Sequence, residues 1–253
     1  MNIIKTKKKL GQHFLNDISI AKDIVKEVDS EKNILEIGPG TGILTNFLVK
    51  NKFQNLIAID LDNRSIKYLE TKKKFQKITL VSADILKVDF GSLFKGNFSI
   101  IGNLPYNISS QILFKILEFR NSIDIVVIML QKEVAERISS LNNSKKYGIL
   151  SVLIQTFFEV SITLEVEPKS FNPPPKIQSS VLKLVRNDVN DIGVDFNYYK
   201  TIIKGSFQSR RKTLRNSLKN LNLSKNLDLN IFSKRAEELS IDDFIWLANF
   251  LKK

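Results

Sequence analysis

The fold of this chain is decided by the stretch Asn33-Ile34-Leu35-Glu36-Ile37-Gly38-Pro39-Gly40-Thr41-Gly42. Its apolar first half is typical of a strand buried on both faces of a parallel sheet. Its glycines stand before a helical stretch, where they allow a tight turn and a ligand at a helix N-terminus. A dinucleotide fingerprint needs the third glycine three positions after the second, and here it follows after two. The turn therefore favours a ligand without a pyrophosphate, with a purely structural turn as the alternative.

Apolar runs and helical stretches alternate along most of the chain, which predicts an α/β, Rossmann-like, doubly wound sheet. The last two apolar runs lack a long helix between them, so we expect an antiparallel hairpin at one edge. Helices are predicted over 42–51, 65–75 and 131–141, and from Ser109 or Ser110. The predicted strands are Asn33–Ile37, Leu56–Asp60, Ile78–Val81, Phe98–Gly102, Ile125–Leu130, Val160–Leu164 and Ser180–Val185.

The sequence pattern changes after Val185. Residues 187–197 are polar and contain Gly193, and residues 198–253 show helical periods alone. The run 240–243 has the form of a capping box before a terminal helix. We therefore predict two domains, residues 1–186 around the sheet and an all-α domain of residues 187–253.

Acidic residues follow the strands on the carboxyl side of the predicted sheet. Asp60 ends the second strand about twenty residues after the glycine turn, where a carboxylate can accept both ribose hydroxyls of a nucleoside. Asp84 follows the third strand and can accept a hydrogen bond from the amine of adenine. Together with a phosphate-free glycine turn, these residues indicate S-adenosylmethionine. Glu36 either contacts this cofactor or orients the turn, and the sequence leaves both open.

A second motif, Asn103-Leu104-Pro105-Tyr106, follows the predicted strand Phe98–Gly102. The side-chain oxygen of Asn103 and the carbonyl of Leu104 can accept both hydrogens of a planar amine, Pro105 stiffens the turn, and the ring of Tyr106 can stack on the base. These two hydrogen bonds favour a pyramidal amine nitrogen whose lone pair points at a methyl donor. The motif therefore predicts methyl transfer to an exocyclic amine; the alternative is an ordinary turn with a core aromatic residue.

Composition narrows the partners. The 253 residues contain no cysteine and one histidine, which argues against disulfides, thiolate sites and a multi-histidine metal site, so no metal is expected. The net charge of +13 favours an anionic partner, although a lysine-rich proteome is an alternative. Two basic clusters fit the phosphates of a large RNA. The first, in the N-terminal arm, consists of Lys5, Lys7, Lys8 and Lys9. The second, near the C-terminus, consists of Lys204, Arg210, Arg211, Lys212, Arg215 and Lys219. The second could instead be a solvated face.

No run of apolar residues is long enough for a transmembrane helix, and the lysines of 1–9 precede no apolar signal segment. We therefore expect a cytoplasmic protein without a membrane partner.

These motifs together resemble the bacterial KsgA-type ribosomal RNA small-subunit adenine dimethyltransferases, nearly end to end. The segments that carry the resemblance are Leu10-Gly11-Gln12-His13-Phe14-Leu15, 36–42, 103–107, Met129-Leu130-Gln131-Lys132-Glu133-Val134, Phe171-Asn172-Pro173-Pro174-Pro175-Lys176 and Arg210-Arg211-Lys212-Thr213-Leu214-Arg215-Asn216. The last two discriminate best, because many methyltransferases have a glycine turn. Two residues depart from the commonest family form, His13 (often Asn) and Asp60 (often Glu).

The resemblance implies dimethylation of the N6 amines of two adjacent adenosines in the 3′-terminal hairpin loop of 16S rRNA, with S-adenosylhomocysteine as product. It implies that residues 1–15 form a basic arm and cofactor lid and that residues 187–253 bind RNA. We expect the protein to be a monomer. Phe171 would stack on the target base opposite Tyr106. The cofactor would contact His13, Leu15, Gly38, Gly40, Asp60, Asp84 and Asn103.

Four alternatives remain at this point. An Erm-type 23S rRNA adenine methyltransferase shares the Gln-Phe-Leu start and the Asn-X-Pro-Tyr site, although the triple proline and the 210–216 segment argue against it. A non-catalytic ribosome-assembly factor would use the basic clusters alone. A DNA adenine methyltransferase usually has Asp in place of Asn103. An NAD enzyme fits least, because of the glycine spacing.

Overall fold

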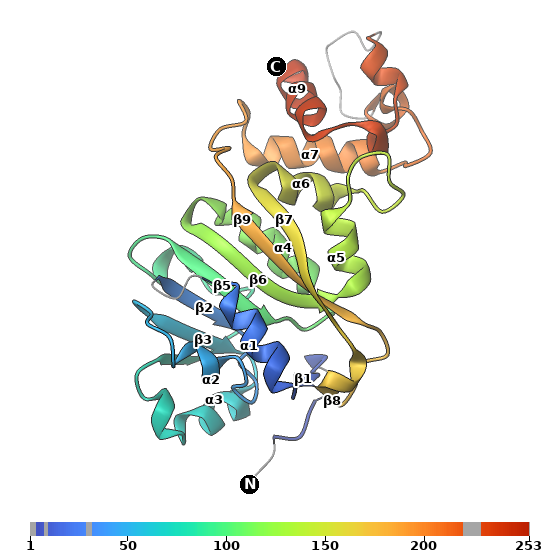
Figure 1. Cartoon of the computed structure of the whole chain (residues 1–253). Coiled ribbons are helices and arrows are strands. Elements are labelled where there is room, and N and C mark those ends of the chain that lie inside the picture. The colour runs from blue at the N-terminus through green and yellow to red at the C-terminus, as the bar shows by residue number, and fades with distance from the viewer. Residues whose placement is uncertain (1–3, 8–9, 29–31, 220–228, 253) are drawn as a thin grey trace. The chain divides into compact units, whose positions relative to one another are not determined.

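A seven-stranded sheet with the order β4-β3-β2-β5-β6-β9-β7 organises the computed structural model, which describes residues 4–7, 10–28, 32–219 and 229–252 (Figure 1). The central strands β4 to β6 are parallel, and β9 runs antiparallel to β6. The strands are β2 (Asn33–Ile37), β3 (Leu56–Asp60), β4 (Thr79–Ser82), β5 (Phe98–Asn103), β6 (Ile123–Gln131), β7 (Phe158–Val166) and β9 (Ser179–Arg186). All seven predicted strands are present, with ends that shift by at most two residues.

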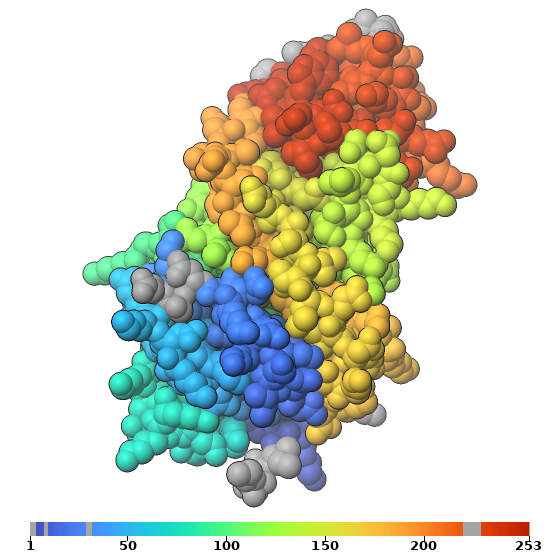
Figure 2. Space-filling view, in the orientation of Figure 1, coloured from blue at the N-terminus to red at the C-terminus, as the bar shows by residue number. Residues whose placement is uncertain are grey.

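Helices cover both faces of the sheet, as expected for a doubly wound fold (Figure 1). Ala21, Ile24 and Val25 of α1 and Leu48 of α2 pack in one apolar cluster with Ile34 of β2. In the space-filling view, α1 and α2 form the surface on this side, and every residue of β2 is buried (Figure 2). These helices are α1 (Ile18–Lys26), α2 (Thr45–Leu48), α3 (Asn63–Glu70), α4 (Ser109–Glu118) and α5 (Lys132–Ser139). The sequence did not predict α1, and the helix predicted over 42–51 has α-helical geometry only over Thr45–Leu48.

A second, two-stranded sheet joins the N-terminal arm to the proline-rich loop. It consists of β1 (Phe14–Leu15) and β8 (Phe171–Asn172), and Leu15 lies opposite Phe171 in an antiparallel pairing. Both side chains are buried, with 3% and 2% of their surfaces exposed. The sequence did not predict this sheet, because it pairs segments that are more than 150 residues apart and short enough to carry no periodicity.

The chain forms two compact units, residues 1–135 with 161–186, and residues 136–160 with 187–253. The second unit contains α6 (Ile149–Phe157), α7 (Phe196–Phe207), α8 (Leu214–Ser217) and α9 (Ile241–Leu251). The C-terminal part of the second unit begins at the predicted boundary near residue 186. The unit also contains residues 136–160, which the sequence analysis assigned to the first domain. The reason is that α6 packs against α7 and α9. The capping box at Ser240 is confirmed, because its hydroxyl accepts from the Asp243 N–H at 3.1 Å.

Within the described ranges, the helices are too short or too polar to cross a membrane.

Candidate active site

A cavity lies at the carboxyl edge of the parallel strands, entirely within residues 10–108. It holds about 880 Å³ of empty space, including some open solvent, which is within the range of small-molecule sites, roughly 300–1,000 Å³. In doubly wound sheets ligands bind at this edge. The predicted site residues that line the cavity are His13, Gly38, Gly40, Asp60, Asp84, Asn103, Leu104, Pro105 and Tyr106.

The glycine turn and Asp60 hold each other in place. The Gly40 N–H donates to Asp60 Oδ2 at 3.1 Å, and the Asp62 N–H donates to Oδ1 at 2.8 Å. Burial raises the pKa of the Asp60 carboxyl, while these two amides oppose the rise. Gly38 has a φ of +71°, and a Cβ there would project to 3.6 Å from the Asn103 carbonyl oxygen, on the wall of the cavity. The turn therefore leaves room that a side chain would fill.

Glu36 orients the turn and does not line the cavity. It is 1% exposed, and the hydroxyl of Thr45 donates to its Oε1 at 3.0 Å. Burial raises the pKa of Glu36 to about 8. Of the two roles that the sequence left open, this geometry is that of a carboxyl group that holds the start of α2.

Asp84 lines the cavity next to Ile85, after the end of β4. Its Oδ1 accepts the Leu86 N–H at 3.0 Å, which turns the chain away from the strand. Since a carboxylate has further acceptor positions, Asp84 can still accept a hydrogen bond from a ligand.

Asn103 ends β5 with its amide fixed. Its Nδ2 donates to the carbonyl oxygen of His13 at 2.9 Å, so the amide nitrogen faces the N-terminal arm. The Leu104 N–H donates to the Met129 carbonyl at 3.0 Å and fixes the following peptide. The Tyr106 hydroxyl lies 2.6 Å from Ser179 Oγ, and burial raises the pKa of Tyr106. The site can thus offer acceptors from Asn103 and Leu104 beside an anchored aromatic ring.

His13 stacks on Tyr106. The ring centroids are 5.7 Å apart with an interplanar angle of 22°. His13 Nδ1 lies 2.7 Å from the Pro173 carbonyl oxygen, and since a carbonyl can only accept, Nδ1 carries the proton. The imidazole therefore connects the proline-rich loop to the Asn103–Tyr106 motif.

Two predicted site residues do not reach the cavity. Phe171 is in the apolar core with Leu15, both held there by the β1–β8 pairing. Phe171 was expected to stack on the target base opposite Tyr106; the residue is 2% exposed and lies in the apolar core cluster with residues of the sheet. Leu15 was expected at the cofactor, but its side chain is likewise buried in the core.

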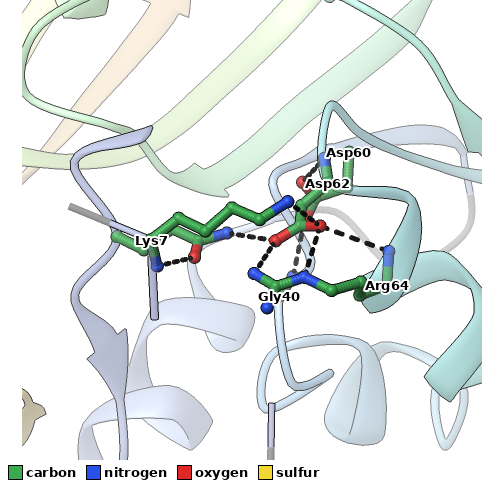
Figure 3. A network of polar contacts seen from close by, with 6 residues as sticks. Lys7, Gly40, Asp60, Asp62 and Arg64 are labelled. Atoms are coloured by element: carbon green, nitrogen blue, oxygen red, sulfur yellow. Dashed lines mark hydrogen bonds and ion pairs between the residues drawn. The ribbon is translucent and has the colours of Figure 1, made fainter. Parts of the chain in front are cut away.

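A polar network that the sequence did not predict ties the N-terminal arm to the end of β3 (Figure 3). At its centre is Asp62, which accepts from Gln12 Nε2 at 3.0 Å, from Lys7 Nζ at 3.4 Å and from Arg64 Nη2 at 2.6 Å. The hydrogen bonds from Arg64 hold the pKa of Asp62 well below its usual range. The one signal in the sequence was the N-cap position of Asp62, directly before α3.

The predicted RNA-contact residues differ in environment. In the second unit, Arg210 is engaged within the fold: its Nη2 donates to the carbonyls of Lys145 at 2.8 Å and Tyr147 at 3.0 Å and to Glu237 at 3.1 Å. Arg211, Lys212 and Arg215 are exposed. In the first unit, Lys7 pairs with Asp62, while Lys8 and Lys9 lie outside the described residues.

Comparison with known proteins identifies the family. The family model described as "Ribosomal RNA adenine dimethylase" matches residues 3–253. A "Ribosomal RNA small subunit methyltransferase A" of Cytophaga hutchinsonii is 46% identical over 255 residues, which cover 99% of each chain. The protein of that name from Parabacteroides distasonis is 47% identical over 258 residues, 100% of this chain and 96% of the relative.

Solved structures agree with the fold. A dimethyladenosine transferase from Plasmodium falciparum aligns with a TM-score of 0.80 at 27% identity, over 93% of this chain and 96% of that one. The 23S rRNA methyltransferase ErmE aligns with a TM-score of 0.67 at 23% identity, over 92% and 98% of the chains, which shows a shared fold alone. With a full-length family match and relatives near half identity, the chain belongs to the ribosomal RNA adenine dimethylase family.

Proposed function

We propose that this protein transfers methyl groups from S-adenosylmethionine to the N6 amines of two adjacent adenosines in the 3′-terminal hairpin loop of 16S rRNA. The observation that carries the proposal is the geometry of Asn103. Its Nδ2 is committed to the His13 carbonyl, so its oxygen is the part of the amide left to accept from an amine. The names of the relatives, small-subunit rRNA methyltransferases, support the choice of substrate.

The residues of the cavity suit this cofactor. Asp60 is buried, and each of its oxygens accepts one backbone N–H, which leaves a further acceptor position on each for the ribose hydroxyls. Asp84 would accept a hydrogen bond from the adenine amine, and Ile85 would pack against the base. Gly38 leaves room for the ligand at the turn. When bound, S-adenosylmethionine supplies an electrophilic sulfonium methyl group and leaves as S-adenosylhomocysteine.

The chain's own groups prepare the amine. The Asn103 side-chain oxygen and the Leu104 carbonyl would accept the two N6 hydrogens. This draws the nitrogen lone pair out of the ring and aims it at the methyl carbon, so that the N–C bond forms as the S–C bond breaks. The amine then loses one proton to solvent, so no general base with a shifted pKa is needed. A second round gives the dimethylated product.

Tyr106 would provide the stacking surface for the extruded base. Its hydroxyl is anchored on Ser179 at 2.6 Å, which fixes the plane of the ring. We assign the stacking to Tyr106 and not to Phe171, because Phe171 is buried in the core of the first unit.

The RNA backbone would be bound through exposed cations. Arg211, Lys212 and Arg215 of the second unit are exposed, and the net charge of +13 favours a polyanion. We propose that the substrate is 16S rRNA within the small ribosomal subunit or its precursor, in the cytoplasm. We further propose that the protein acts as a monomer.

The test is methylation of undermodified small subunits with labelled S-adenosylmethionine, followed by mass spectrometry of the 16S 3′ hairpin. We expect two dimethyladenosines with the wild-type protein and a loss of at least about 100-fold with Asn103→Ala. Asn197→Ala is a matched control, because Asn197 is an exposed residue of α7 in the second unit. Label in 23S rRNA, or equal label with Asn103→Ala, would contradict the proposal. Normal subunit assembly without methylation would favour an assembly factor.

A further inference from the structure

Asp62 is a buried carboxylate that the reaction itself does not need. It is 2% exposed and does not line the cavity. Its oxygens accept from Arg64 on its own helix and from two residues of the N-terminal arm, Gln12 and Lys7 (Figure 3). A carboxylate of this kind is costly to bury unless it is paired and hydrogen-bonded. Asp62 and the arm therefore stabilise each other.

The arm forms one side of the cofactor cavity. Leu10, Gly11, Gln12, His13 and Phe14 all line it. The amide of Gln12 bridges two partners: its Oε1 accepts the Lys7 N–H at 2.8 Å, and its Nε2 donates to Asp62 at 3.0 Å. This double contact fixes both the orientation of the amide and the path of the arm.

Asp62 is also connected to the residue proposed to hold the ribose. The Asp62 N–H donates to Asp60 Oδ1, and the other Asp60 oxygen accepts the Gly40 N–H. At the far end of the arm, the His13 carbonyl accepts from Asn103. The arm is thus tied at one end to the cofactor side of the cavity and at the other to the amine side.

We propose that Asp62 is a positioning residue for methyl transfer, which acts through Gln12 and Lys7 to hold residues 10–14 against the cofactor. The inference rests on the proposed function, because it assumes that the cavity binds the methyl donor. Its effect falls on cofactor affinity and not on the chemical step, since Asp62 touches neither reacting atom. Loss of the contact raises the KM for S-adenosylmethionine and leaves kcat within about twofold.

The experiment compares Asp62→Asn, Gln12→Ala, the double variant and Arg64→Ala by calorimetric titration with S-adenosylhomocysteine. Asparagine is a good N-cap, so Asp62→Asn keeps the start of α3 and removes the charge. Arg64→Ala is the matched control, because it removes the 2.6 Å partner of Asp62 without touching the arm. We expect each arm-directed variant to bind roughly 10-fold more weakly, the double variant no more weakly than the worse single one, and Arg64→Ala within about twofold of wild type.

Hydrogen exchange of the ligand-free protein gives a second, independent measurement. The amides of residues 10–14 should exchange faster than in the wild-type protein in Asp62→Asn and Gln12→Ala. In Arg64→Ala their exchange rates should be unchanged. Unchanged exchange and affinity in the arm-directed variants, additive losses in the double variant, or an equal loss in Arg64→Ala would overturn the inference. If the wild-type protein fails to bind S-adenosylhomocysteine, the proposed function fails, while the exchange data still decide the role of Asp62.

Discussion

At the scale of single residues, Glu36 is a buried carboxyl group whose protonation depends on the fold. Burial raises its pKa from 4.5 to about 8. Below pH 4.5 both the folded and the unfolded chain carry the proton, whereas between the two values only the folded protein keeps it. The free energy of unfolding therefore falls as pH rises through this window, by up to roughly 1.4 kcal/mol per pH unit.

This linkage predicts that Glu36→Gln flattens the pH dependence of stability between pH 5 and pH 8, because glutamine carries no titrating proton. Urea unfolding at several pH values measures the effect. Glu159→Gln, at an exposed position of β7, should keep the wild-type slope. Parallel slopes for wild type and Glu36→Gln would contradict a raised pKa.

Tyr106 combines a ring and a hydroxyl group with separable roles. Stacking of a base on an aromatic ring contributes about 1–3 kcal/mol, so Tyr106→Ala should raise the KM for the small subunit roughly 5- to 100-fold. Tyr106→Phe keeps the ring and loses the contact with Ser179, so its KM should stay within several-fold. Steady-state methylation with varied subunit concentration distinguishes the two, and equal defects would show that the hydroxyl group matters as much as the ring.

At the scale of elements, α6 decides how the chain divides. The Tyr199 hydroxyl on α7 lies 2.9 Å from Thr156 Oγ1 on α6, and Tyr199 is fully buried. This contact places 149–157 with the C-terminal helices and not with the sheet domain that the sequence predicted. A buried hydrogen bond of this kind contributes about 1 kcal/mol.

Tyr199→Phe should therefore lower the thermal transition by about 2–4 °C. Tyr198→Phe is the matched control, because the neighbouring tyrosine on α7 is only partly buried, and its transition should move by less than about 1 °C. Calorimetric scans measure both. An equal effect of the two substitutions would show that the hydroxyl of Tyr199 adds nothing to the packing of α6 on α7.

At the scale of the whole molecule, the net charge of +13 includes neighbouring arginines that make different contacts. The Arg210 side chain is 46% exposed and bonds to two backbone carbonyls and to Glu237. Arg211 and Lys212 are exposed as well. A phosphate contact contributes close to one unit to the slope of log affinity against log salt. We therefore expect Arg210 to stabilise the fold and Arg211 and Lys212 to bind RNA.

We expect Arg211→Ala with Lys212→Ala to weaken subunit binding and to reduce the salt slope by about 1–2, with an unchanged thermal transition. Arg210→Ala should instead lower the thermal transition, with a loss of roughly 1 kcal/mol, and keep the salt slope. Binding at several salt concentrations, with thermal scans of the same proteins, measures both effects. A reduced salt slope in Arg210→Ala alone would reverse the assignment.

The sequence by itself determined the parallel sheet and several of the residues that meet at its carboxyl edge. Strands such as β2 and β3 could be predicted residue by residue, because continuous apolar runs and strand-end turns are local signals. The convergence of Gly38, Asp60, Asp84 and Asn103 followed from one rule, that parallel strands end at the same edge.

Only the tertiary structure decided which contacts the arm and the proline-rich loop make. The pairing of Leu15 with Phe171, the stack of His13 on Tyr106 and the contact of Gln12 with Asp62 each join residues at least 50 positions apart. A single side chain in a short segment has no period and no turn chemistry that specifies a distant partner. Burial and hydrogen-bond satisfaction across the assembled fold choose such partners, which is why Phe171 became a core residue and Asp62 the anchor of the arm.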